Sequence, residues 1–249
     1  MRFRPVAIAF LALSIAACGK GGADSGAAGG AVSTNTAANV APPPGGDWTT
    51  VVSGSGDGIV MGNPDAKVKL LEIASLGCPF CKRFEDEGVP EVMKLVKAGQ
   101  VQWEFRPFII HGPVDVAANL IARCNGPQGF FPMSAALYRE QERWMGRFEQ
   151  APPERVARLQ GLPPTQAFVE AATLAGLQGI AAQNGLPSAK ANQCLADEAA
   201  IEREVAVTAN AQSEFPVFKG TPGFAINGQF VPNASSWADL KPALEAALR

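Results

Sequence analysis

The sequence predicts an α/β fold in which a βαβ unit and a final ββα unit are separated by a large helical insertion at about 112–212. Three observations support this prediction. A strand–helix–strand pattern runs from residue 67 to 105, Ala/Leu-rich helical periodicity then continues for about a hundred residues, and Asn227-Gly228 marks a β-hairpin. The roughly 200 residues at 47–249 fit one domain, or one domain with an insertion.

The βαβ unit begins at "KVKLLEIAS", residues 67 to 75, whose apolar and branched side chains favour a strand. Residues 79 to 98 have helical spacing of apolar side chains, and "VQWEF" at 101 to 105 follows the short break "KAGQ". A strand–helix–strand unit of this kind is expected to be parallel and right-handed.

The insertion is predicted from Ala/Leu-rich segments separated by glycines and prolines. They lie at 113–124, 130–148, 152–160, 164–183, 187–195 and 198–211. The stretch "GFAINGQFVP" then gives two short strands, 224–226 and 229–231, around the turn. A last helix is expected from about Ser235 to Leu248, with Ser235 or Ser236 as its cap.

The N-terminus predicts export. Residues 1–17 combine two arginines with an apolar run that is too short to span a bilayer but typical of a signal peptide. The alternative is a buried N-terminal helix. The segment 13–18, "LSIAAC", resembles the lipobox of bacterial lipoproteins, with Ile15 where leucine is more usual, and this resemblance implies lipidation of Cys18. Ordinary signal cleavage nearby is the other reading.

Residues 18–46 are predicted to be the lipidated cysteine and a disordered tether, because the tract has almost nothing bulky to bury. The folded domain is then 47–249. Removing 1–17 takes away Arg2 and Arg4 and leaves 19 basic against 23 acidic residues, a net charge of −4. No basic surplus indicates nucleic-acid binding. The expected location is the periplasm or cell envelope, with a lipid anchor in the membrane.

The odd number of cysteines, five, is explained once Cys18 is assigned to lipidation. The other four cysteines can form two pairs, Cys78 with Cys81 and Cys124 with Cys194. A structural bridge between Cys124 and Cys194 would close a loop of about 70 residues. Two buried free thiols are the alternative at these positions.

The motif Cys78-Pro79-Phe80-Cys81 has several possible uses. Covalent haem needs a histidine directly after the second cysteine, but Lys82 stands there. A structural zinc site needs a second close pair of ligands, and His111, interpreted as a loop residue, is the only histidine. No metal or other cofactor is therefore expected. A redox pair is favoured over a buried structural disulfide.

Redox chemistry needs one thiol that ionises easily and a second that resolves the mixed disulfide. Cys78 is expected at the end of a strand-to-helix turn, with Pro79 at the first helical position. The free N–H groups and the helix dipole there favour a Cys78 thiolate. Cys78 is thus predicted to be the exposed nucleophile and Cys81 the more buried resolving thiol.

The order of elements, the C-P-F-C motif, "GTPGFAING" at 220–228 and Glu72 together resemble the thioredoxin fold with a helical insertion found in DsbA-like thiol:disulfide oxidoreductases. The resemblance covers about 59–249. It implies that Glu72 is a buried acid that relays a proton to or from Cys81, whereas strand alternation alone would also allow an edge-strand surface residue. It also implies a cis bond at Thr221-Pro222 beside the sulfurs.

The predicted function is thiol–disulfide exchange, most simply the oxidation of exported proteins that contain thiols. The resemblance implies a membrane redox partner, either a quinone-linked oxidase or an electron donor. Phe80 replaces the histidine of C-P-H-C relatives, so a less oxidising site is expected. Rival readings are a reductase or isomerase, disfavoured because 19–46 cannot form a dimerisation domain, and a non-catalytic binding module.

Overall fold

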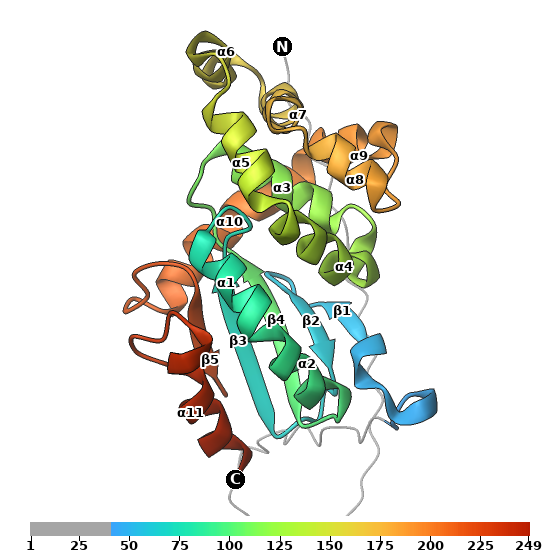
Figure 1. The fold of residues 1–249 in the computed structure, drawn as a ribbon, viewed down its shortest axis with the longest axis vertical. Coiled ribbons are helices and arrows are strands. Elements are labelled where there is room, and N and C mark those ends of the chain that lie inside the picture. The colour runs from blue at the N-terminus through green and yellow to red at the C-terminus, as the bar shows by residue number, and fades with distance from the viewer. Residues whose placement is uncertain (1–40) are drawn as a thin grey trace, which may run out of the picture. The chain divides into compact units, whose positions relative to one another are not determined.

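The computed structural model describes residues 41–249. The predicted signal peptide, Cys18 and most of the predicted tether lie outside the described residues. Within them, the predicted α/β architecture is present as one mixed sheet with helices on both faces (Figure 1).

The sheet has the strand order β1-β2-β4-β3-β5-β6. Its strands are β1 (Val52–Gly54), β2 (Ile59–Gly62), β3 (Val68–Ala74), β4 (Val101–Pro107), β5 (Gly223–Ile226) and β6 (Gln229–Phe230). β3 and β4 are parallel, as the βαβ prediction required, and the other neighbours are antiparallel. β3 is therefore a central strand, paired with β4 on one side and β5 on the other.

Strands β1 and β2 were not predicted from the sequence. Both are short, and β1 is mostly exposed, so neither has a clear alternation of apolar and polar side chains. They extend the sheet on the far side of β4, where β2 pairs along Ile59 to Gly62. The reading of 224–226 and 229–231 as a hairpin is confirmed, since Asn227 and Gly228 both adopt the positive φ of a tight two-residue turn.

The helices follow the expected order with more interruptions. They are α1 (Pro79–Glu87), α2 (Val89–Lys97), α3 (Pro113–Arg123), α4 (Gly126–Arg139), α5 (Gln141–Glu149), α6 (Pro153–Arg158), α7 (Pro164–Ala175), α8 (Leu177–Gln183), α9 (Ser188–Leu195), α10 (Glu198–Glu214) and α11 (Trp237–Leu248). The 3₁₀ helices are η1 (Pro44–Gly46), η2 (Trp48–Thr50) and η3 (Leu159–Gly161). Ser236, one of the two proposed caps, accepts a hydrogen bond from the Asp239 backbone N–H.

Three predicted helices are each split in two. The helix expected at 79–98 breaks at Gly88, because Pro90 has no N–H to continue the ladder of hydrogen bonds. The helix expected at 164–183 breaks at Gly176, which has a left-handed φ of 74°. The helix expected at 130–148 starts earlier and breaks between α4 and α5 at Glu140, so that Gln141 begins a new helix.

The two faces of the sheet are covered differently. Val68 and Leu70 belong to a large apolar core that also contains residues of α1, α2 and α11. Leu71 and Ile73 point to the opposite face, where Ala211 of α10 covers them. Helices α3 to α9 gather at the end of the sheet from which α1 begins (Figure 1). The end of β3 that leads into α1 therefore faces the insertion.

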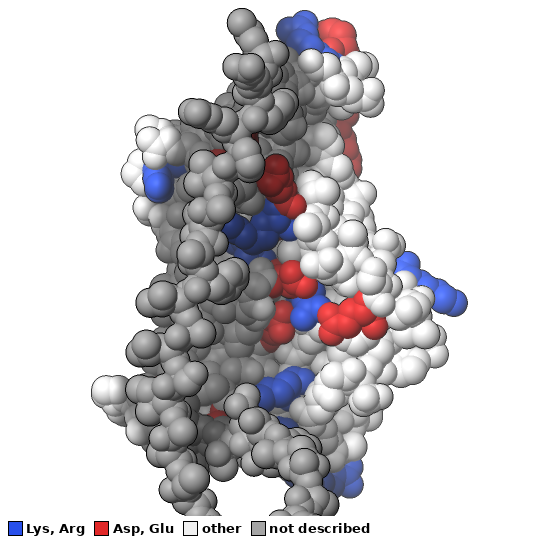
Figure 2. Space-filling model, turned by 180° about the vertical axis from the view of Figure 1, so that it is seen from behind, with Lys and Arg blue, Asp and Glu red and all other residues white. Residues whose placement is uncertain are grey.

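Acidic and basic side chains are interspersed on the described part of the face shown in Figure 2. Several such side chains are paired across elements. Arg106 of β4 forms ion pairs with Glu104 and with Glu214 of α10, and Arg123 of α3 pairs with the buried Glu204 of α10 at 2.7 Å. These pairs tie α10 to β4 and to the first helix of the insertion.

Candidate active site

Cys78 and Cys81 lie where β3 passes into α1. Cys78 is the N-cap residue of α1, with φ −78° and ψ 123°, and Pro79 occupies the first turn as predicted. The backbone N–H of Cys78 donates to the Ser75 carbonyl at 3.2 Å, and the Lys82 N–H donates to the Cys78 carbonyl at 3.0 Å. The structure holds both cysteines as free thiols, with Cys81 one helical turn beyond Cys78.

The prediction that Cys78 is exposed is wrong. Cys78 is only 3% exposed, and Cys81 is fully buried. The reason is the loop before β5, whose Thr221 carbonyl oxygen lies 3.3 Å from the Cys78 sulfur. Phe80, between the cysteines, is the exposed residue of the motif, at 53%. A partner must therefore reach the Cys78 sulfur at the boundary between Phe80 and this loop.

The Thr221–Pro222 peptide bond is cis in the structure. The bond directly precedes β5, and β5 pairs with β3 in the centre of the sheet. Because β3 leads into Cys78 and β5 follows Pro222, the sheet itself brings residues 143 positions apart into contact. The predicted halves of the site, C-P-F-C and Thr221-Pro222, thus lie together.

The environment of Cys78 lowers its pKa from the usual value to about 6. The largest cause is a hydrogen bond from the Cys81 thiol to the Cys78 sulfur. Thr221 and the backbone N–H groups of Cys81 and Phe80 also stabilise the thiolate, while burial opposes it. Unpaired N–H groups at a helix start are the expected source of such stabilisation.

Thr221 contributes differently to the thiol and to the thiolate. In the thiol form, Cys78 S–H donates to the Thr221 carbonyl at 3.3 Å, an interaction that an ionised sulfur cannot make. The Thr221 hydroxyl oxygen is buried and has no hydrogen-bond partner among residues 41–249. We therefore attribute the part of the Cys78 pKa shift that Thr221 causes to the Thr221 hydroxyl, which can donate a hydrogen bond to the thiolate.

Cys81 and Glu72 both have raised pKa values, in contrast to Cys78. Burial raises the pKa of Cys81 well above its usual value, and the charges of Cys78 and Glu72 raise it further. Glu72 is 2% exposed, and burial likewise raises its pKa well above the usual range. The Trp103 indole N–H donates to Glu72 Oε2 at 3.1 Å. The edge-strand alternative for Glu72 is wrong, because β3 is central in the sheet.

Glu85 is a second carboxyl group near this pair, and no sequence pattern singled it out. Glu85 follows Cys81 by one turn of α1, and its charge is the second-largest cause of the raised Glu72 pKa. Burial raises the pKa of Glu85 itself to about 7. Glu85 and Trp103 both line a cavity of about 290 Å³ between α1, α2, α4 and β4. An acid that is about half protonated near pH 7 thus lines this cavity and interacts electrostatically with Glu72.

A groove of about 760 Å³ is lined by Phe80 of the cysteine motif and by Thr221, whose carbonyl contacts the Cys78 sulfur. The loops on either side of the β5–β6 hairpin form most of it, and Thr221 and Pro222 form its wall near the sulfur. Val217 is 60% exposed at its rim. The groove is open and largely apolar, so that an extended peptide could lie along the cis-proline loop.

The helical insertion also contributes to the site, through side chains that the sequence did not indicate. Asp115 of α3, Tyr138 of α4 and Gln141 of α5 are buried and form hydrogen bonds to Ser75, Leu76, Gly77 or Cys78. Their partners lie 38 to 65 residues away in sequence. No local pattern marks a residue whose partner is that distant.

The family model described as Thioredoxin matches residues 54–246. The chain belongs to the thioredoxin family. The predicted thioredoxin-like fold with a helical insertion is therefore confirmed, and it agrees with the sheet order and the position of the cysteines.

Solved structures and curated relatives are similar to this thioredoxin-family chain. The crystal structure of protein-disulfide isomerase from Novosphingobium aromaticivorans is 29% identical, with a TM-score of 0.72, and the match covers 76% of this chain and 96% of that one. Wolbachia pipientis alpha-DsbA1 is 19% identical, with a TM-score of 0.62 and coverage of 79% and 93%, which supports the fold.

Among curated proteins, the Rickettsia bellii protein named "Putative protein-disulfide oxidoreductase" is 26% identical over 179 residues, 71% of this chain. The match covers 60% of that protein. The Rickettsia prowazekii relative is also 26% identical over 179 residues, covering 71% of this chain and 57% of that protein. The thioredoxin-family chain thus matches less than two thirds of the length of these relatives.

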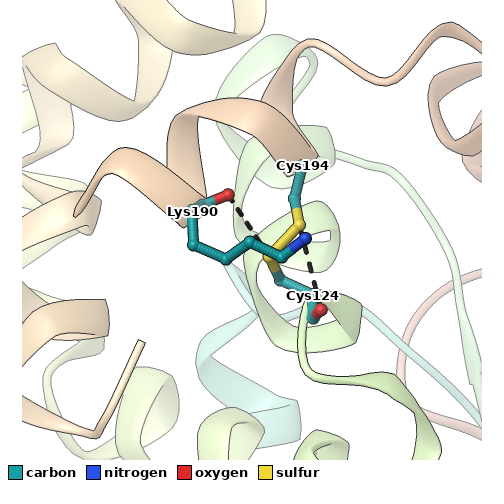
Figure 3. Close-up of a disulfide and its surroundings, with 3 residues drawn as sticks. All are labelled: Cys124, Lys190 and Cys194. Atoms are coloured by element: carbon teal, nitrogen blue, oxygen red, sulfur yellow. Dashed lines mark hydrogen bonds between the residues drawn. A yellow bond between two sulfur atoms is a disulfide. The ribbon is translucent and has the colours of Figure 1, made fainter. Parts of the chain in front are cut away.

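Cys124 and Cys194 form a disulfide in this thioredoxin-family structure, with a Cα–Cα distance of 5.7 Å. The bridge joins the C-terminal end of α3 to α9 within the insertion (Figure 3). The Lys190 carbonyl oxygen lies 3.6 Å from Cys124 Sγ, a contact without a donated proton because a bridged sulfur carries no hydrogen. The bridge is separate from the C-P-F-C motif and stabilises the insertion.

The predicted lipidation site, Cys18, lies outside the described residues. Within residues 41–249, no group of three or more His, Cys, Asp or Glu side chains is arranged to hold a metal ion. In the same residues, no helix is both long enough and apolar enough to cross a membrane.

Proposed function

We propose that this thioredoxin-family chain is a protein-disulfide oxidoreductase of the cell envelope that donates a Cys78–Cys81 disulfide to exported proteins with free thiols. The observation that supports this most is the contrast between the two sulfurs. The pKa of Cys78 falls to about 6, whereas the pKa of Cys81 rises well above its usual value. The Cys78 sulfur is therefore a good leaving group, and the Cys81 sulfur keeps its proton.

The first half-reaction begins with the oxidised enzyme. A substrate thiolate attacks the Cys78 sulfur, the Cys78–Cys81 bond breaks, and a mixed disulfide forms between substrate and Cys78. Cys81 leaves as a thiolate and needs a proton, because burial strongly disfavours its charge. Glu72, protonated through its own burial, is the buried acid that supplies that proton.

The second half-reaction releases the product. A second substrate thiolate attacks the substrate sulfur of the mixed disulfide, and Cys78 departs as a thiolate. The substrate has then lost two electrons and gained a disulfide, while the enzyme holds two reduced cysteines. Reoxidation requires an electron acceptor, which we propose is a quinone-linked membrane oxidase.

The low pKa of Cys78 supports the oxidising direction. Stabilising the thiolate stabilises the reduced enzyme, and a stabilised reduced form makes the disulfide a stronger oxidant. The groove beside Thr221 and Pro222 would hold an extended substrate segment against the loop, in the manner of an added strand.

An isomerase or reductase is the second candidate, supported by the similarity to the Novosphingobium protein-disulfide isomerase over nearly all of that chain. In that case the same Cys78 thiolate attacks a substrate disulfide, and a membrane electron donor keeps the enzyme reduced. The two candidates differ in which form of the enzyme is active.

The test uses a reduced, unfolded substrate protein and a substrate with mispaired disulfides. The oxidised enzyme is expected to form disulfides in the reduced substrate, and Cys78→Ser is expected to abolish this activity. Faster repair of mispaired disulfides by the reduced enzyme, without oxidation of the reduced substrate, would favour the isomerase. Disulfide formation that persists in Cys78→Ser would not come from this site, and a non-catalytic binding module would be the remaining reading.

A further inference from the structure

The turn from Ser75 to Cys78, called here the thiol turn, is held mainly by the helical insertion. We propose that Gln141, Tyr138 and Asp115 are positioning residues that set the ionisation, and hence the oxidising strength, of Cys78. This inference rests on the proposed exchange function and extends it, because it assigns the insertion a part in the chemistry of the site.

Gln141 makes the most direct contact with the nucleophile. It is 3% exposed, and its Nε2 amide group donates to the Leu76 carbonyl at 2.7 Å and to the Cys78 carbonyl at 3.0 Å. A primary amide has two N–H donors, and both are used on the thiol turn. The break between α4 and α5 puts Gln141 at the first position of α5.

Tyr138 fixes the other end of the turn. Its hydroxyl donates to the Ser75 carbonyl at 3.1 Å, and the side chain is 1% exposed. The same carbonyl accepts the backbone N–H of Cys78 at 3.2 Å. Tyr138 therefore bonds to the atom that closes the turn at the nucleophile.

Asp115 ties the thiol turn to the loop after β4. One carboxylate oxygen accepts from Ser75 Oγ at 2.7 Å and from the Ile110 and His111 N–H groups at 3.0 and 3.3 Å. The other oxygen accepts from the Gly77 N–H at 3.2 Å. A Cβ on Gly77 would come within 2.6 Å of the His111 ring, so the His111 loop packs directly on the turn.

The physical link to reactivity is the alignment of the sulfur with the start of α1. The Cys81 thiol and the Phe80 and Cys81 N–H groups lower the pKa of Cys78 only while the sulfur stays close to them. Electrostatic stabilisation at a helix end falls off within one turn. A small rotation of the thiol turn therefore weakens the thiolate without unfolding the domain.

The test is the substitution Gln141→Met in the full chain, which removes both donors and changes no titratable group. The titratable groups around the turn, all of which are retained, are Cys81 and Glu85 of α1, Glu72 of β3, Asp115 of α3, Tyr138 of α4 and His111 in the loop after β4. The rate of Cys78 alkylation is measured across a pH series, together with the glutathione redox equilibrium. We expect the alkylation midpoint to rise by about half to one pH unit, and the redox equilibrium to become about 3- to 10-fold less oxidising.

Tyr138→Phe is the second variant, since it removes one hydroxyl and keeps the ring, and a smaller change in the same direction is expected. Trp144→Phe is the matched control. It removes a buried hydrogen bond to the Leu137 carbonyl within the insertion but none to the thiol turn. We expect Trp144→Phe to lower the thermal midpoint of unfolding and to leave the Cys78 alkylation midpoint unchanged.

The proposal is overturned if Gln141→Met and Tyr138→Phe lower the thermal midpoint as Trp144→Phe does but leave the alkylation midpoint and the redox equilibrium unchanged. Failure of both variants to fold, with the control folded, would also count against it, because the residues would then serve stability alone. Wild-type protein without exchange activity would refute the proposed function instead, whatever the alkylation midpoint.

Discussion

At the scale of single residues, Cys78 and Cys81 show how position decides reactivity. They carry the same thiol three residues apart, yet the pKa of Cys78 falls and that of Cys81 rises. The Cys78 sulfur interacts with the Cys81 thiol and with N–H groups at the helix start, whereas Cys81 is buried more deeply and interacts with the buried Glu72. In the proposed exchange, this difference makes Cys78 the thiol that forms the mixed disulfide and Cys81 the thiol that ends protonated.

Phe80 is the residue whose substitution tests how the motif sets redox strength. Its ring is 53% exposed and carries the Arg83 guanidinium 5.5 Å above it, but it offers no hydrogen bond to Cys78. We expect Phe80→His to make the site about 3- to 10-fold more oxidising in the glutathione equilibrium, because an imidazole can support the thiolate. An unchanged or more reducing variant would contradict this prediction.

Glu85 predicts a pH dependence of stability. Its pKa is raised to about 7 in the folded protein, chiefly by burial, so the native state binds more protons than the unfolded state between about pH 4.5 and 7. The contribution of Glu85 to the free energy of unfolding therefore falls as pH rises through that window. We expect Glu85→Gln to raise the free energy of unfolding at pH 8 by up to about 3 kcal/mol and to have little effect at pH 4.

Chemical denaturation at both pH values measures this effect. Glu87→Gln is the control, since Glu87 is an exposed carboxylate on the same helix. A gain of equal size at pH 4 and pH 8 would show that the Glu85 substitution acts through packing and not through the charge.

At the scale of elements, the insertion is a covalently closed unit. The Cys124–Cys194 bridge closes a loop with a separation of 70 residues. In the chain-entropy account, such a bridge stabilises the fold by about 4 kcal/mol. We expect the double variant Cys124→Ser/Cys194→Ser to lose about that free energy of unfolding in urea denaturation.

The same double variant should retain disulfide exchange with glutathione at 25 °C, because the bridge does not touch the thiol turn. Loss of exchange by a variant that is still folded would indicate a role in the chemistry. An unchanged free energy of unfolding would show that the two thiols are not bridged in solution.

Helix breaks matter at this scale as well. A continuous helix from 130 to 148 was the simplest reading of the periodicity, but the chain stops at Glu140 and restarts at Gln141. Periodicity records which faces are apolar, and α4 and α5 both have such faces. Gln141, at the start of α5, donates to the carbonyls of Leu76 and Cys78, partners 65 and 63 residues away that the local sequence does not indicate.

At the scale of the whole molecule, three distant parts of the chain meet at Cys78: the start of α1, the loop before β5 and the helical insertion. The predicted lipid anchor at Cys18 lies outside the described residues. We expect Cys18→Ser to shift the protein from the membrane fraction to the soluble envelope fraction, because a lipidated cysteine holds a protein at the bilayer by its acyl chains.

Labelling with a fatty-acid analogue and fractionation of cells would measure that shift, with Cys78→Ser as a control that should stay in the membrane fraction. Exchange activity of the released protein should be unchanged. Membrane association that persists in Cys18→Ser would refute the lipid anchor.

The sequence by itself determined the βαβ and ββα units, the place of C-P-F-C at a helix start and the distinct position of Glu72, since these depend on neighbours within a few residues. The tertiary structure alone decided that Thr221 shields Cys78, that Glu85 interacts with Glu72, and that Gln141 and Asp115 form hydrogen bonds to the thiol turn. Burial and hydrogen bonds between residues tens of positions apart arise only when the elements pack, so no local pattern could predict them.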